Sequence, residues 1–146
     1  MKRSLLVEAD GGPLAVVVAG ANVPDAQVLT ATIEAVVLER PVPEPSFRQH
    51  LCLDKGYDNE RGWGACVDHD YEPHIALIRD EGPARRKRHK PRRWVVERTL
   101  AWLSKCRAIL VRWDKQASNY LGLLKLACAL LWFRRLRRLT DLPIAQ

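Results

Sequence analysis

The stretch Leu51-Cys52-Leu53-Asp54-Lys55-Gly56-Tyr57-Asp58 is the most informative part of the sequence, because a short apolar run ends there at an acidic turn. The run 50–53 predicts a strand, and Gly56 lets the chain turn directly after it. Functional side chains of α/β proteins gather at the carboxyl ends of strands. Asp54 is therefore a candidate site residue, although an aspartate here is more ordinarily a turn or cap residue.

Upstream of this stretch, the pattern predicts a β-hairpin followed by a helix. Residues 4–7 and 14–18 are apolar runs joined by Asp10-Gly11-Gly12-Pro13, which has strong turn chemistry. Asp25 can cap a helix beginning near Ala26, and apolar residues then recur at helical spacing until Arg40-Pro41 stops the pattern.

Downstream, the pattern predicts a weak helix over 59–70, a strand over 74–78 and two longer helices over 93–110 and 118–139. The order strand, strand, helix, strand, helix, strand and two helices predicts an α/β fold. A length of 146 residues favours one domain rather than two.

The charge balance favours a polyanionic partner. Lys and Arg total 24 against 17 acidic residues, which gives a formal charge of +7. Cationic side chains that neutralise phosphates release condensed counterions, so such an excess is typical of nucleic-acid binding. Charge alone also fits a basic protein with no nucleic-acid role.

Cysteine usage and hydropathy favour a cytoplasmic protein. The four cysteines form no CxxC pair, and we interpret them as reduced thiols rather than a disulfide frame. Cys66, His69 and His74 lack the second cysteine pair or the histidine spacing of a usual zinc site. No signal peptide is recognisable at the start. The apolar run 120–133 is too short to span a bilayer, so we expect a buried helix and no membrane association.

A second acidic residue follows the most basic segment of the chain. The run Arg85-Arg86-Lys87-Arg88-His89-Lys90-Pro91-Arg92-Arg93 is nearly all cationic and leads into the predicted helix 93–110. Arg93 and Glu97 are four residues apart, so they share one helix face. The arginine can orient the carboxylate or contact a phosphate, while the ordinary interpretation of Glu97 is an exposed, paired helix charge.

Together these motifs resemble the DDE transposases of bacterial insertion sequences, of the insertion sequence 5 type. The resemblance rests on residues 51–58 and on Arg92-Arg93-Trp94-Val95-Val96-Glu97-Arg98-Thr99 with Trp102-Leu103. The upstream stretch 14–25 and the downstream stretch 119–129 also look like that family. The resemblance extends from about Lys2 to Leu139.

The resemblance implies a ribonuclease H-like fold and a divalent-metal site, for Mg²⁺ or Mn²⁺, made of three acids. Asp54 matches the family's second aspartate, Glu97 its glutamate and Arg93 the arginine before that glutamate. Two positions depart from the family pattern. Lys90 stands where a tyrosine is frequent, and Ser104, with Lys105 next, stands where a basic residue usually follows the glutamate.

The family's first aspartate lies on the central strand of the sheet, upstream of anything in this chain, and Asp10 is not assigned its role. We therefore expect an α/β, ribonuclease H-like core lacking its first strand, with two C-terminal helices. Residues 1–146 would form a partial catalytic domain: a hairpin and sheet part over 1–80, a basic loop over 81–92 and a helical part carrying the glutamate over 93–140.

The resemblance implies DNA transposition by metal-dependent strand cleavage and strand transfer. Asp54 and Glu97 would be catalytic and hold the metal, whereas a set of basic residues would bind DNA: Arg85, Arg86, Lys87, Arg88, Lys90, Arg92, Arg93 and Lys105. Expected partners are transposon ends, target DNA, and the upstream half or an intact transposase, with homo-oligomers when complete, at the nucleoid. This chain alone is expected to be inactive.

Two alternatives stay open. The chain could be a non-catalytic DNA-binding fragment or decayed remnant that modulates an intact transposase. It could also be a basic structural or ribosome-associated protein, which needs only the charge.

Overall fold

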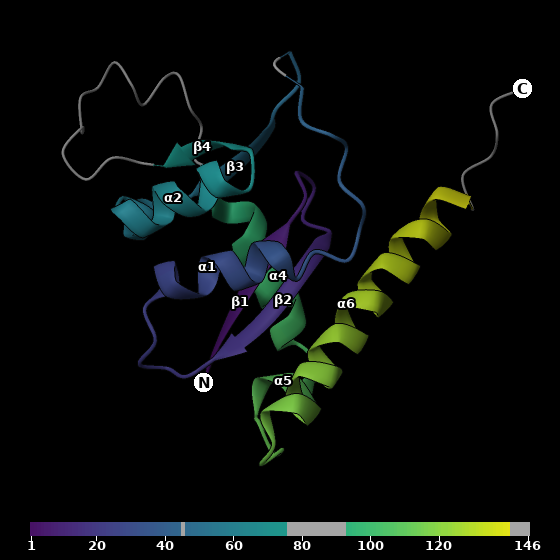
Figure 1. Cartoon of the computed structure of the whole chain (residues 1–146). Helices are drawn as coiled ribbons and strands as arrows, with labels where there is room; N and C mark the ends of the chain where they lie inside the picture. The colour runs from purple at the N-terminus through teal and green to yellow at the C-terminus, as the bar shows by residue number, and fades with distance from the viewer. Residues whose placement is uncertain (45, 76–92, 141–146) are drawn as a thin grey trace, which may run out of the picture.

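The computed structural model describes residues 1–44, 46–75 and 93–140, except for the side chain of Arg93 (Figure 1). Along the chain, the elements that it describes are β1 (Lys2–Val7), β2 (Pro13–Ala19), α1 (Asp25–Glu34), β3 (Gln49–Leu53), the 3₁₀ turn η1 (Lys55–Tyr57), α2 (Glu60–Asp68), β4 (Tyr71–Ile75), α4 (Arg93–Ser104), α5 (Arg107–Leu110) and α6 (Ala117–Thr140).

The predicted hairpin is confirmed. β1 and β2 pair in antiparallel fashion with Leu5 opposite Val16, and the register shifts between Leu6 and Val7. Gly11 in the connecting turn has a φ of 87°, a left-handed conformation that glycine adopts without a steric cost. The backbone of Glu8 closes the turn with hydrogen bonds to Gly11 and Gly12, each 2.9 Å long.

The predicted strand before Asp54 is confirmed as β3, which pairs in parallel with β4. β4 begins at Tyr71, three residues earlier than predicted, and positions 76–78 of the predicted strand lie outside the described residues. Among the described residues, β1–β2 and β3–β4 form two separate two-stranded sheets. The mixed α/β class is therefore confirmed, whereas the structure describes no single sheet.

The helices follow the predicted order with different ends. Pro24 is the cap residue of α1, and Asp25 lies in the first turn, where it accepts a 2.8 Å hydrogen bond from Lys2 instead of capping. The predicted helix 93–110 is broken, because Cys106 adopts an extended conformation between α4 and α5. α6 matches the predicted last helix within one residue at each end.

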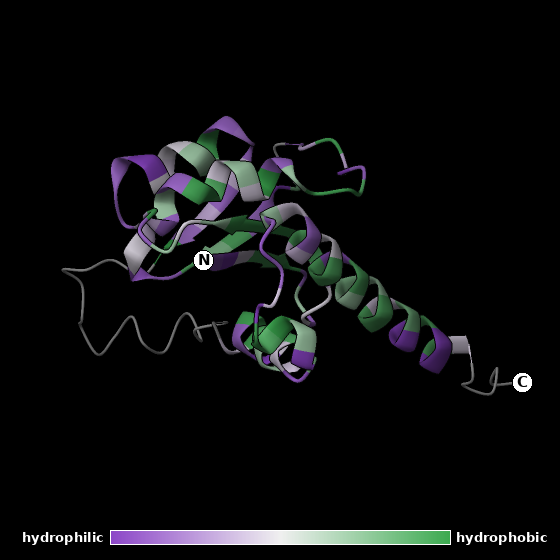
Figure 2. Ribbon diagram, turned by 90° about the horizontal axis from the view of Figure 1, so that it is seen from below, coloured by the Kyte–Doolittle hydropathy of each residue, from purple (hydrophilic) through white to green (hydrophobic). Residues whose placement is uncertain are grey.

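Two hydrophobic clusters hold these elements together. One joins β2 to the C-terminal helices through Val16, Leu103, Ile109, Tyr120, Leu124 and Ala127. The other joins α1, α2 and the β3–β4 sheet through Leu29, Ile33, Leu51, Ala65, Cys66 and Tyr71, and Leu6 of β1 packs against it. The hairpin thus lies between the two cores, and its strands are among the greenest, most apolar ribbons of Figure 2.

α6 is buried along one side only. Leu124 is fully buried, whereas Leu126 and Phe133 expose 58% and 62% of their surface. The expectation of a buried helix thus holds for one face of α6 and fails for the other. Among the described residues, no helix is both long enough and apolar enough to cross a bilayer.

Candidate functional site

Asp54 directly follows β3 and begins the 3₁₀ turn η1. Its side chain is exposed, and its Oδ1 atom accepts a 2.8 Å hydrogen bond from the backbone N–H of Gly56. The turn role that the sequence left open for Asp54 is therefore present. A carboxylate offers about four lone-pair sites, so this bond occupies only one of them and a second role is compatible with it.

Tyr57 closes the same turn and lies in a negative field. The pKa of Tyr57 is raised to about 12, first by burial against the α1–α2 core and then by the negative charges of Asp25 and Asp54. A negative charge on a phenolate is disfavoured where two carboxylates already act. The turn that carries Asp54 is therefore a site that favours positive charge.

Glu97 lies on the exposed side of α4, between two buried residues of the same helix. Val95 and Thr99 expose only 5% and 3% of their surface. The Thr99 hydroxyl donates a 2.7 Å hydrogen bond to the Gly11 carbonyl, and Arg98 donates a 2.5 Å bond to the Asp10 carbonyl. The first half of α4 is thereby fixed to the turn that follows β1.

The elements that carry the two acids are linked through the end of β1. Leu6, near the end of β1, packs against the same core cluster as Leu53, the residue before Asp54. The hairpin turn that follows β1 is bonded to α4 one or two residues from Glu97. Among the described residues no group of three His, Cys, Asp or Glu is arranged to hold a metal ion. That Asp54 and Glu97 share a cation stays a prediction.

Most of the predicted DNA-binding residues lie outside the described residues, namely Arg85, Arg86, Lys87, Arg88, Lys90 and Arg92. Arg93 is the first residue of α4, and its side chain also lies outside the description. Lys105 is exposed one residue beyond the end of α4.

Arg3 was missed by the sequence analysis. Ser104, seven residues beyond Glu97, receives a 3.3 Å hydrogen bond from Nη2 of Arg3 on β1. The Nη1 atom of Arg3 is buried and has no hydrogen-bond partner within the described part of the chain. The structure thus brings a cation from a distant strand to the position where the sequence has a serine. Contacts across 101 residues leave no local pattern that could have revealed it.

Glu8 was also missed. Its carboxylate accepts backbone hydrogen bonds from Asp10 at 2.8 Å and Gly12 at 2.5 Å, and a bond from Nη1 of Arg135 at 2.7 Å. Burial alone would raise the pKa of Glu8, but these bonds and the Arg135 charge hold the pKa below its usual value. The position of Glu8 shortly before the turn glycines indicates a contact within the turn, and it does not indicate a contact with α6.

The zinc candidates have other contacts. Cys66 is fully buried, and burial raises the pKa of its thiol. His69 contacts the Ala65 carbonyl through Nδ1 at 2.9 Å, and His74 lies 2.7 Å from Nδ1 of His50 across the β3–β4 ladder. All four cysteines are free thiols, as expected.

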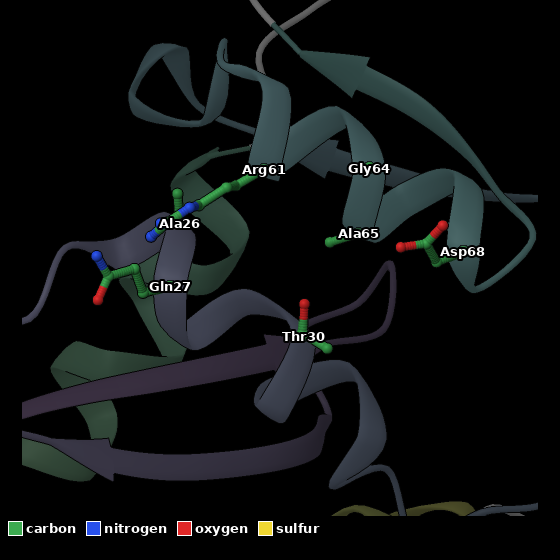
Figure 3. Close-up of a pocket in the computed structure, with 7 residues that line it drawn as sticks. All are labelled: Ala26, Gln27, Thr30, Arg61, Gly64, Ala65 and Asp68. Atoms are coloured by element: carbon green, nitrogen blue, oxygen red, sulfur yellow. The ribbon is translucent and has the colours of Figure 1, made fainter.

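A pocket of about 550 Å³ lies between α1 and α2 (Figure 3). Its polar lining comes from Gln27 and Thr30 on α1 and from Arg61 and Asp68 on α2, beside the small residues Ala26, Gly64 and Ala65. None of the predicted site residues lines it. The pocket is therefore distinct from the positions of Asp54 and of Glu97.

Comparisons with known proteins agree with the resemblance. Residues 1–132 match the family model described as the transposase DDE domain. A curated Burkholderia cepacia protein, described as a transposase for insertion sequence element IS402, is 37% identical over 142 residues. The match covers 94% of this chain and 64% of that relative, so the chain spans about two thirds of the relative's length. No solved structure matches the chain.

Proposed function

We propose that the chain, which belongs to the transposase DDE-domain family, forms part of a catalytic core for DNA transposition. Asp54 and Glu97 hold Mg²⁺ or Mn²⁺ in this core, and basic residues around them hold DNA phosphates. The observation that carries the proposal is the family match over residues 1–132, which includes both the Asp54 turn after β3 and Glu97 on α4.

The donor chemistry of the two acids suits a hard divalent cation. Mg²⁺ takes oxygen ligands, keeps several waters and is commonly bound through one or two carboxylates plus substrate phosphates. Both side chains are exposed, as ligands that meet an incoming phosphodiester must be. When bound, such ions stabilise the attacking and the leaving oxygen of an in-line displacement.

The chain's own residues position the DNA. Asp25 and Asp54 both place negative charge near Tyr57, which supports the binding of a cation at the Asp54 turn. Arg93 and the basic segment 85–92 neutralise the phosphates that approach the metal, as guanidinium groups do by paired hydrogen bonds. Arg3 supplies a positive charge beside Ser104, where the family usually has a basic residue on the helix of the glutamate.

We further propose that the two sheets are parts of one ribonuclease H-like sheet. β1 pairs only with β2 and β3 only with β4 in the described part of the chain, so each of these two strands keeps one edge without a partner strand. Unpaired sheet edges expose N–H and C=O groups that favour pairing with another strand. Leu6 of β1 packs against the core cluster to which β3 also belongs, so β1 and β3 lie near each other. This supports one further strand between the unpaired edge of β1 and the unpaired edge of β3.

That further strand is not among the described residues, and it carries the third acid in this proposal. We place it in a segment upstream of this chain, and the chain on its own would be inactive because a third carboxylate for the metal is missing. The 64% coverage of the IS402 relative leaves room for such a segment.

Restoring the upstream half tests the proposal in a strand-transfer assay with Mg²⁺. Asp54→Asn and Glu97→Gln are each expected to lower activity by at least about a thousandfold, because in-line displacement loses a metal ligand. Asp68→Asn and Glu72→Gln, which neutralise exposed acids on α2 and β4, are the matched controls and keep parent activity. Parent-like activity of either site variant would remove that residue from the metal site.

The second candidate function is a non-catalytic DNA-binding fragment. It needs only the formal charge of +7 and neither of the two carboxylates. It predicts salt-sensitive DNA binding by this chain and no Mg²⁺-dependent cleavage even when the upstream half is supplied. Cleavage in the reconstituted protein would exclude it.

A further inference from the structure

A second pocket, of about 490 Å³, lies between α4 and α6 beside the turn that joins β1 to β2. Of the described residues that line it, four are arginines and one is acidic: Arg98, Arg134, Arg135, Arg138 and Asp10. Neither Asp54 nor Glu97 lines this pocket, so it is separate from the proposed metal ligands.

Two of the arginines have structural partners. Arg135 donates to the Glu8 carboxylate at 2.7 Å and to the Asp10 carbonyl, and Arg98 donates to that same carbonyl at 2.5 Å. Glu8 neutralises Arg135. Arg98 keeps its charge at the wall of the pocket, because a neutral carbonyl is its partner.

The other two arginines are arranged for an outside ligand. Arg134 and Arg138 are exposed and lie one helical turn apart on α6. The Arg134 guanidinium lies 5.7 Å from the centre of the Trp102 ring, a cation–π contact that leaves its N–H donors available. They are separated by about 6 Å along the helix, so both can face the same extended polyanion.

We propose that this pocket binds phosphate groups of a duplex DNA backbone through Arg98, Arg134 and Arg138. Three cations face one acidic side chain, Asp10, once Arg135 is paired with Glu8. Guanidinium groups bind phosphates by paired hydrogen bonds. Several neighbouring cations suit a polyanion better than they suit a single small anion. The choice of DNA as the polyanion rests on the proposed function, whereas the pocket rests on its own geometry.

Two double variants of the full chain test this site. Arg134→Gln with Arg138→Gln removes the pair in the pocket, and Lys125→Gln with Arg137→Gln removes the same charge from positions of α6 that do not line it. Binding of a short labelled duplex is measured by fluorescence anisotropy at several salt concentrations. Circular dichroism checks that all proteins keep their helix content.

The pocket variant is expected to lower the slope of log K against log salt by about 2, since each lost phosphate contact removes about 0.9. Its affinity at about 0.1 M salt falls at least tenfold, while the control stays within about twofold of the parent. Equal weakening by both variants would show a general charge effect and overturn the proposal. Displacement of DNA by polyglutamate at equal charge concentration would also overturn it, because the pocket would then accept any polyanion.

The outcome is separable from that of the proposed function. Salt-sensitive binding by the parent that the pocket variant leaves unchanged refutes the pocket and leaves the metal site standing. A selective loss in the pocket variant supports the pocket even if Asp54→Asn keeps strand-transfer activity.

Discussion

Single polar residues fix the hairpin turn to the C-terminal helix. Glu8 accepts bonds from two backbone amides of the turn and from Arg135, which lies 127 residues away. Asp54 stabilises a turn locally, since its carboxylate accepts a hydrogen bond from the backbone N–H of Gly56 in the same turn. The local role of Asp54 could be predicted from the sequence, because turn chemistry depends on neighbours. The role of Glu8 could not, because its partner comes from a remote helix.

Replacing Glu8 tests these contacts through the pH dependence of the free energy of unfolding. Because the pKa of Glu8 is held below its usual 4.5, its contribution to stability is complete above that pH and is lost as the pH falls through the lowered pKa. Glu8→Gln should therefore cost about 1–3 kcal/mol at pH 7. The gap to the parent, measured by urea unfolding, should narrow below pH 4.5. A gap that stays constant from pH 7 to pH 3 would contradict this.

Tyr57 gives a second test, in which the stability of the folded chain changes at alkaline pH. Its pKa is raised to about 12, so the neutral phenol stabilises the folded chain fully below about pH 10. This stability is lost as the pH rises from about 10 towards 12. Tyr57→Phe cannot ionise and should therefore lose less stability than the parent between pH 9 and pH 11 in urea unfolding. Equal losses in both proteins would show that the fold does not raise the pKa of Tyr57.

At the scale of elements, the position of α6 depends on a close approach to the hairpin turn. Trp132 donates a 2.8 Å hydrogen bond to the Pro13 carbonyl, and a methyl group added at Gly12 would lie 2.4 Å from the Trp132 ring. The hairpin, α2 and α6 could be predicted from periodicity and turn residues. The break at Cys106 could not, because the apolar spacing continues across it.

Gly12→Ala should displace Trp132 and destabilise the chain by about 1–3 kcal/mol, the usual cost of overpacking. Gly64→Ala is the matched control, since nothing lies within 4 Å of an added methyl group there and alanine favours the helix. The control should be neutral or slightly stabilising. Thermal unfolding measures both, and equal melting temperatures for the two variants would mean that α6 is not seated on the turn.

At the scale of the whole molecule, two small sheets are joined by helices and by two hydrophobic clusters. The α/β class could be predicted from the order of elements, and the family from two motifs 40 residues apart. Which strands share a sheet could not be predicted. Strands that are distant in sequence pair through contacts that leave no local sequence pattern. The metal site has the same difficulty, since Asp54 and Glu97 lie on different elements, each of which is linked to the region at the end of β1.

The most direct test of the central claim is Mn²⁺ binding by the 146-residue chain, followed by electron paramagnetic resonance. If Asp54 and Glu97 share one cation, the parent binds a single weak Mn²⁺, and Asp54→Asn and Glu97→Gln each abolish binding, as does the double variant. Asp68→Asn keeps parent-like binding. Two site variants that each retain parent-like affinity, or whose effects simply add, would contradict the claim that the two carboxylates meet at one metal ion.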